Sequence, residues 1–231
     1  METRIRQIEL NGLLFQYRET GEVTAPPLLA LHALGQNAAS WDHIAAELGH
    51  QYRVLALDQR GHGGSARPGV YTFELMCEDL LCFANTLGLE KFTLLGHSMG
   101  GTVSFLFAES YPDRIERLII EDTPPPFESL PAEIPSEPPS EPLPFDWLVI
   151  PSIIQQLNAP NPIWWARMPE ILAPALIIGG GSTSPIPQNK LKEAADLIPD
   201  CELVTIEGSG HFVHEANPQP FLSAVKKFLG I

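Results

Sequence analysis

The chain has 231 residues, a length that a single α/β domain can fill. Hydrophobic residues make up 44% of it, which is enough for a sizeable buried core and argues against wholesale disorder. A formal net charge of −14 repels phosphate backbones and anionic lipid, so neither nucleic acid nor a membrane surface is expected as a partner.

The cysteine content and the hydrophobic runs set the expected compartment. Three cysteines without a Cys-x-x-Cys pair predict neither a disulfide framework nor a zinc site. No run of about 18 apolar residues is present, and the first residues lack the apolar stretch of a signal peptide. We therefore expect a cytoplasmic protein that acts on a small molecule, as a monomer or a small homo-oligomer.

Hydrophobic periodicity predicts an α/β sheet with flanking helices. Two alternating segments, 5–10 and 13–17, flank Asn11-Gly12 and predict an antiparallel hairpin. Short, nearly continuous apolar runs follow, typical of strands buried on both faces of a parallel sheet. These runs are Leu28–Leu31, Val54–Leu57, Phe92–Leu95, Leu118–Ile120, Ala175–Ile178 and Leu203–Ile206. The helix-like segments between them are Trp41–Leu48, Phe73–Leu87, Thr102–Ser110, Asn189–Ile198 and Pro220–Leu229. This alternation predicts βαβ units with right-handed crossovers.

One segment breaks the alternation. Residues 123–169 hold 13 of the 23 prolines, and proline removes backbone donors and fixes φ. The second half of the segment turns apolar and aromatic, and tryptophan side chains are costly to leave in water. We expect residues 123–170 to form a lid over a site, inserted between core segments 1–122 and 171–231. A disordered linker is the alternative.

The sequence Gly96-His97-Ser98-Met99-Gly100 carries the strongest chemical signal. A Gly-x-Ser-x-Gly pattern between an apolar strand and a helix predicts a nucleophile elbow, the sharp turn that presents a reactive serine. Glycine is needed two residues before and after the serine, because a Cβ there would clash with the turn or the adjacent strand. The Met99 N–H, at the start of the helix, is placed to stabilise an oxyanion.

Together with three other motifs, this pattern resembles the α/β-hydrolase superfamily. The other motifs are Leu31–Gly35, Asp58–Ser65 and Gly208–His211. The resemblance covers nearly the whole chain and implies a mostly parallel eight-stranded sheet flanked by helices, with a short lid insertion. It also implies that His211 is the base for Ser98, with His214 as the rival histidine. The second oxyanion donor would be the Leu34 N–H.

The family's common position for the third member of the triad, after the seventh strand, contains no carboxylate here. A minority of the superfamily, including some lipases and dehalogenases, carries this acid after the sixth strand, where the chain has Glu121-Asp122. Asp122 falls on the equivalent position, and we expect it to orient His211 and stabilise its cationic form. Glu121 is the alternative, because period-two alternation lets only one of the two side chains face the site.

These residues predict two-step acyl transfer through an acyl-enzyme on Ser98, with no metal or organic cofactor. The expected substrate is a small ester, thioester, lactone or amide, held in an apolar pocket made by the lid residues Phe145, Trp147, Trp164 and Trp165. Cofactor-free perhydrolysis, carbon–carbon bond hydrolysis and a menaquinone-pathway-type elimination are alternatives on the same fold. A ligand-binding sensor with little or no turnover is the alternative from outside the enzymes.

Overall fold

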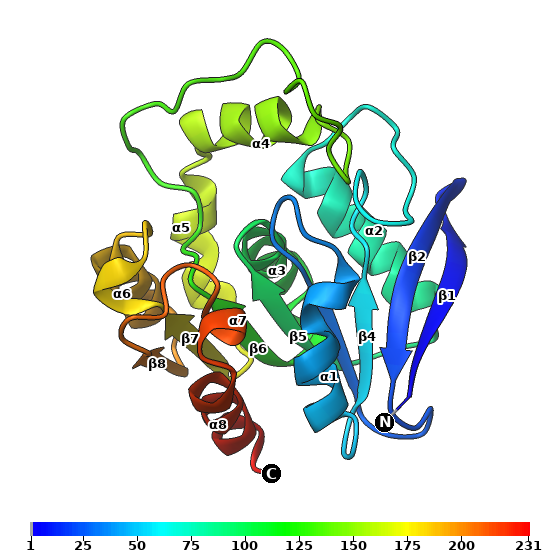
Figure 1. Cartoon of the computed structure of the whole chain (residues 1–231). Helices are drawn as coiled ribbons and strands as arrows, with labels where there is room; N and C mark the ends of the chain where they lie inside the picture. Colours follow the sequence, from blue (N-terminus) through cyan, green and yellow to red (C-terminus); the bar gives the residue numbers. More distant parts are fainter. Residues whose placement is uncertain (1) are drawn as a thin grey trace.

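The computed structural model describes residues 2–231, and its centre is an eight-stranded sheet (Figure 1). The strand order is β1-β2-β4-β3-β5-β6-β7-β8. The strands are β1 (Thr3–Leu10), β2 (Leu13–Thr20), β3 (Pro27–Leu31), β4 (Arg53–Leu57), β5 (Phe92–His97), β6 (Ile115–Glu121), β7 (Ala175–Gly179) and β8 (Cys201–Thr205). The predicted α/β architecture, a mostly parallel sheet flanked by helices, is confirmed.

The first two strands form the predicted antiparallel hairpin. Asn11 and Gly12 at its tip both have positive φ, of 52° and 77°, which is the conformation that a tight two-residue turn requires. β2 then pairs antiparallel with β4, and from β4 to β8 every neighbouring pair is parallel. The carboxyl ends of the parallel strands therefore meet at one edge of the sheet.

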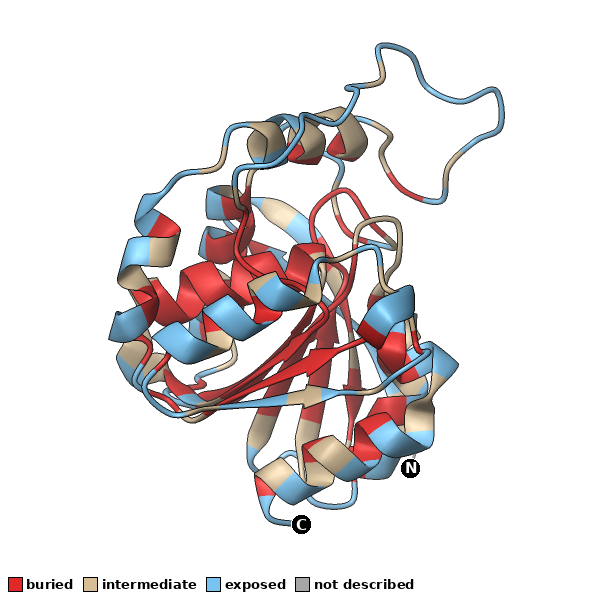
Figure 2. Cartoon of the chain, turned by 90° about the vertical axis from the view of Figure 1, so that its left-hand side faces the viewer, coloured by how far each residue is buried: buried red, intermediate tan, exposed pale blue. Residues whose placement is uncertain are grey.

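Alternate residues of the central strands pack on opposite faces of the sheet. In β3, for example, Leu29 and Leu31 join one hydrophobic cluster while Leu28 and Ala30 join the other. The first face is covered by α2 (Phe73–Thr86), α3 (Met99–Ser110) and α6 (Gln188–Leu197). The second is covered by α1 (Asp42–Leu48) and α8 (Pro218–Leu229). Figure 2 shows the central strands buried between these helices. The remaining short elements are η1 (Ala38–Trp41), η2 (Pro112–Arg114), η4 (Gly181–Thr183) and α7 (Val213–Ala216).

β8 differs from the expectation of burial on both faces. Glu202, Leu203 and Thr205 are all exposed. The reason is position, because β8 is the last strand of the sheet and pairs only with β7. An apolar run alone does not distinguish a central strand from this edge strand.

The segment between β6 and β7 lies over the carboxyl edge of the sheet (Figure 1). Its first part, up to residue 148, is an irregular proline-rich loop, and α4 (Val149–Asn158), α5 (Ile163–Arg167) and η3 (Met168–Glu170) follow. Pro151 falls in the first turn of α4, where a missing N–H costs the helix nothing. Gln156 fixes α4 to the start of α2, because its Oε1 accepts a hydrogen bond from the Phe73 N–H at 3.0 Å. A lid role for this segment stays a prediction.

None of the helices within residues 2–231 has the length and apolar character needed to cross a bilayer.

Candidate active site

Ser98 lies in a sharp turn between β5 and α3. Its backbone has φ 52° and ψ −117°, a left-handed conformation that is strained for a residue with a side chain. The flanking glycines leave no room for a Cβ: one at Gly96 would lie 2.3 Å from Ser104 Oγ, and one at Gly100 would lie 2.4 Å from the Leu31 carbonyl oxygen. The spacing of the motif is thus explained by close backbone approach on both sides of Ser98.

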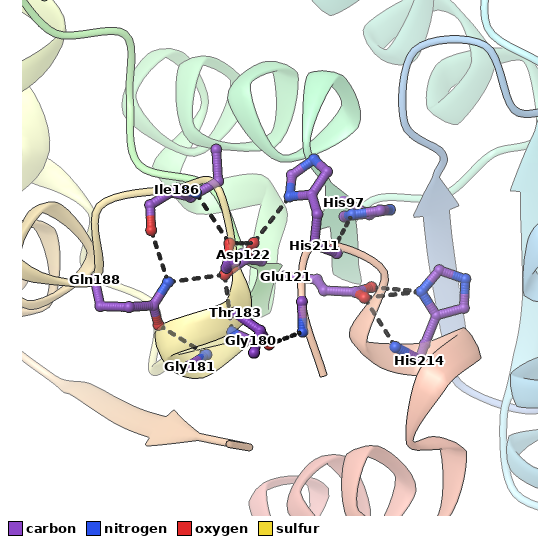
Figure 3. Close-up of polar contacts among 12 residues, drawn as sticks. His97, Glu121, Asp122, Gly180, Gly181, Thr183, Ile186, Gln188, His211 and His214 are labelled. Atoms are coloured by element: carbon purple, nitrogen blue, oxygen red, sulfur yellow. Dashed lines mark hydrogen bonds and ion pairs between the residues drawn. The ribbon is translucent and has the colours of Figure 1, made fainter. Parts of the chain in front are cut away.

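Asp122 follows β6 directly and faces His211. The Nδ1 atom of His211 lies 2.8 Å from Asp122 Oδ2 (Figure 3). The carboxylate also accepts hydrogen bonds from the Gly180 N–H at 2.8 Å, from the Gln188 amide at 3.2 Å and from the Ser184 hydroxyl. Gly180 and Ser184 belong to the stretch after β7, where the family commonly carries the acid and this chain has no carboxylate. Here that stretch instead donates hydrogen bonds to Asp122.

Two opposing effects act on the pKa of Asp122. Burial raises it, because the charged form loses water, while the hydrogen bonds from His211, Ser184, Gly180 and Gln188 lower it. The combined effect of the hydrogen bonds is larger than that of burial, so the pKa of Asp122 lies below its ordinary value. Asp122 is therefore a carboxylate at neutral pH and can stabilise positive charge on His211.

Glu121 points away from Asp122 and binds the second histidine of the same loop. His214 Nδ1 lies 2.7 and 2.9 Å from the two Glu121 carboxylate oxygens, and the His214 backbone N–H donates to Oε1 at 2.9 Å. Both side chains are buried, and Trp41 stacks on the His214 ring with 4.2 Å between ring centroids. Alternation along the strand thus separates the two carboxylates, and of the two only Asp122 is hydrogen-bonded to His211 among the described residues.

His97 connects the turn to the loop that carries His211. Its Nε2 lies 2.8 Å from the His211 carbonyl oxygen, and its ring lies 4.8 Å from that of His211 and 5.5 Å from that of His214. Burial lowers the pKa of His97 to about 4, so the ring is neutral near pH 7 and can donate its single proton from Nε2.

His97, Glu121 and His214 are also the side chains that could hold a metal ion. One ligand atom from each lies within 4.8 Å of the others, and all three residues are buried. However, His214 Nδ1 is already bonded to Glu121, and His97 Nε2 already contacts the His211 carbonyl. We therefore interpret the three side chains as supports behind the Asp122–His211 pair, with Glu121 bound to His214 and His97 bound to the His211 carbonyl. His97 Nδ1 and His214 Nε2 have no hydrogen-bond partner within the described residues.

The two expected oxyanion donors lie beside Ser98. Leu34 and Met99 line the same cavity as Ser98, and within residues 2–231 neither backbone N–H donates a hydrogen bond. The loop that carries Leu34 is held by buried neutral histidines: burial lowers the pKa of His62 to about 3, and its Nε2 accepts the Gly35 N–H at 3.1 Å. His32, whose pKa burial lowers to about 4, accepts the Gln59 N–H in the same way. The segment Asp58–Ser65 thus supports the neighbouring loop.

Within residues 2–231, no hydrogen bond joins Ser98 to His211. The Asp122 contact uses Nδ1 of His211, which leaves Nε2 as the nitrogen that could accept a proton. Hydrogen bonds between a nucleophile and its base are often long without substrate and tighten when the substrate binds. The arrangement provides a strained serine, an oriented imidazole and two free N–H groups along one edge of the sheet.

A cavity of about 470 Å³ opens at Ser98, within the size range of small-molecule sites, about 300–1,000 Å³. The prediction that Phe145, Trp147, Trp164 and Trp165 line this site is wrong, since none of them is among the residues that line the cavity. The wall is instead formed by one face of α4, together with prolines of the preceding loop.

The aromatic side chains have other partners. Phe145 stacks on His62 with 5.2 Å between ring centroids, and Trp164 packs edge-on against Phe73 at 5.7 Å. The Trp165 indole N–H donates to the Pro126 carbonyl at 2.8 Å. Trp147 is half-buried just before α4. Phe145 and Trp164 thus anchor the segment to the core. The sequence signal for the cavity wall was the i, i+3, i+4, i+7 spacing of apolar residues from 150 to 157.

Comparisons with known proteins agree with this fold. Residues 26–142 match the family model described as alpha/beta hydrolase fold. A putative esterase/lipase of Haemophilus influenzae is 26% identical over 95% of this chain and 88% of its own length. The sn-1-specific diacylglycerol lipase ABHD11 of Mus musculus is 28% identical over 90% of this chain and 82% of its own. The crystal structure of a hydrolase from Pseudomonas aeruginosa PA01 superposes with a TM-score of 0.86 at 26% identity, covering 99% of both chains.

Proposed function

Because the chain belongs to the alpha/beta hydrolase fold family, we propose that it is a serine hydrolase that cleaves a small ester-type substrate through an acyl-enzyme on Ser98. The observation that carries this proposal is the 2.8 Å contact between Asp122 and His211, beside the strained turn at Ser98. The relatives named as esterases and lipases support a hydrolase on this fold.

The proposed reaction has two steps. His211 takes the Ser98 proton through Nε2 while the serine oxygen attacks the substrate carbonyl, and the Asp122 carboxylate stabilises the imidazolium that forms. His211 then protonates the leaving group, which departs and leaves the acyl group on Ser98. Water repeats the sequence on the acyl-enzyme, releases the carboxylic acid and restores the serine hydroxyl.

The negative charge on the carbonyl oxygen needs donors that are fixed before the reaction. The Leu34 and Met99 N–H groups fill this role in the proposal, since both border the cavity and have no other partner within the described residues. The Met99 N–H also lies at the start of α3, where the helix dipole favours negative charge. Esters, thioesters, lactones and amides all pass through such an oxyanion.

Hydrolysis of a chromogenic short-chain ester tests the proposal. Ser98→Ala is expected to reduce kcat by about 10⁶-fold, the loss measured when the nucleophile of a serine triad is removed. Ser110→Ala, at the opposite end of α3, is the matched control and is expected to keep full activity. Full activity of Ser98→Ala would eliminate the acyl-enzyme route.

A further inference from the structure

The cavity at Ser98 has no charged lining. Its polar residues are Ser98, Thr102, Thr123 and Ser129, and the rest of the lining is aliphatic, aromatic, proline or methionine. Placing a charged acyl tail there would remove the charge from water without a partner, which costs far more than placing an alkyl chain there gains. The lining therefore favours an uncharged, apolar acyl group.

One face of α4 gives the cavity an elongated wall. Ile150, Ile153, Ile154 and Leu157 all line it, at the i, i+3, i+4, i+7 spacing that places residues on one side of a helix. At 1.5 Å of rise per residue, this stripe is about 10 Å long. A wall of that length suits an extended chain of medium length better than an acetyl group, which would leave most of the stripe without contacts.

The segment over the cavity is acidic. From residue 118 to residue 166 the sequence has no lysine or arginine, and the proline-rich loop exposes Glu128, Glu133, Glu137 and Glu141. Lys190, which lies over the rings of Phe127 and Trp165 in a smaller neighbouring cavity, is paired with Glu193 at 2.6 Å. The approach to Ser98 is thus negative, and it repels anionic substrates at low ionic strength.

We infer that the substrate is a neutral ester or thioester with an unbranched, medium-length acyl chain that lies along the Ile150–Leu157 stripe. Acyl groups attached to a polyphosphate carrier are disfavoured at low ionic strength by the negative charge of the surrounding segment. This inference rests on the proposed function, because it assigns a substrate to the Ser98 acyl-enzyme.

The first test is a series of neutral 4-nitrophenyl esters from acetate to laurate. We expect kcat/KM to rise by about fourfold per added methylene up to about octanoate, since each buried methylene contributes about 0.8 kcal/mol, and then to stop rising. Ile154→Trp fills the cavity and should move the optimum to a shorter chain, because it should lower kcat/KM for octanoate far more than kcat/KM for acetate. Leu148→Trp, an exposed site just before α4 that does not line the cavity, is the matched control.

Leu157→Trp, at the more exposed end of the stripe, serves as a second filling variant if Ile154→Trp does not fold. A flat chain-length profile in the wild type, or equal effects of either filling variant on acetate and octanoate, would overturn the assignment of the stripe.

The second test compares octanoyl-coenzyme A with S-octanoyl-pantetheine, which share the thioester and the pantetheine unit, whereas the coenzyme adds three phosphates and an adenosine. The salt dependence of the ratio separates the effect of the phosphate charge from that of the adenosine. The neutral thioester should have at least a tenfold higher kcat/KM at low salt, and the ratio should fall as salt is added. Replacing all four exposed glutamates of the loop by glutamine should reduce this ratio. A preference for the coenzyme A ester would overturn the charge assignment.

The outcomes separate the inference from the function on which it rests. Ser98-dependent hydrolysis of acetate without a chain-length effect would remove the inference and keep the serine hydrolase. Absence of Ser98-dependent hydrolysis across the whole series would remove the proposed function itself.

Discussion

The Nε2 atom of His97 lies 2.8 Å from the carbonyl oxygen of His211, so the residue that precedes Ser98 is bonded to the residue proposed as its base. Two further contacts connect the same elements. The Ser98 N–H donates to the Glu121 carbonyl at 3.3 Å, and the Glu121 carboxylate binds His214 in the loop that carries His211. The serine, the acid strand and the base loop thus hold one another in place.

Removing the His97 donor should misplace His211 without removing any reacting group. We expect His97→Phe to lower kcat by about 10²-fold with KM nearly unchanged, since small displacements of a catalytic group have effects of this size. His97→Gln, whose amide can donate to the same carbonyl, should restore most of kcat. Steady-state kinetics with melting curves tests this, with His43→Phe on the surface of α1 as control. Equal kcat in His97→Phe and His97→Gln would show that the hydrogen bond has no positioning role.

The two adjacent carboxylates should respond very differently to conversion to amides. Asp122→Asn should lower kcat by about 10⁴-fold while the protein still folds, because an amide neither stabilises the imidazolium nor holds the correct tautomer of His211. Glu121→Gln keeps an oxygen that can accept from His214, and should lose little activity while lowering stability. Kinetics and urea unfolding of both variants distinguish these effects. The opposite ranking of kcat would assign the acid to Glu121.

Glu109 should make stability fall as pH rises. Burial raises the pKa of this α3 carboxyl to about 8, and neither carboxyl oxygen has a hydrogen-bond partner within residues 2–231. Between the unfolded pKa of about 4.3 and the folded value, the folded state binds the extra proton, so wild-type stability should decrease by up to about 1.4 kcal/mol per pH unit from this group.

Glu109→Gln should remove this pH dependence. The free energy of unfolding of the variant, relative to that of the wild type, should therefore increase from pH 5 to pH 8. Urea unfolding at several pH values measures the difference, with exposed Glu202→Gln as control. A stability difference that does not change with pH would contradict the raised pKa.

Much of this architecture could be predicted because periodicity and turn chemistry act locally. Apolar runs located the six strands from β3 to β8, and the alternating segments on either side of Asn11-Gly12 located the two strands of the hairpin. Strand alternation also correctly predicted that the side chains of Glu121 and Asp122 face opposite sides, since one contacts His214 and the other contacts His211. Pairing of His211 with Asp122 was expected from the family resemblance, while the bond between Glu121 and His214 was not, because the partner of a buried side chain depends on tertiary packing.

The cavity lining is where local reasoning failed. Aromatic residues between 145 and 165 were assigned to the pocket because large apolar side chains must be buried, but burial does not specify against which surface. Phe145 packs on His62 and Trp164 on Phe73, and α4 supplies the wall of the cavity instead. The many prolines of the segment argued against a helix there, so α4 was not predicted. Pro151 lies in the first turn of α4, where a proline does not interrupt the helical hydrogen bonds.

The most direct measurement of the central claim is reaction of the purified chain with a fluorophosphonate, followed by mass mapping of the adduct. An activated serine attacks phosphorus and keeps the phosphonyl group, whereas an ordinary serine does not. We predict a single adduct on Ser98, and much slower labelling in the His211→Ala variant. An unmodified Ser98 under conditions where the protein hydrolyses esters, or equally fast labelling without His211, would contradict the account.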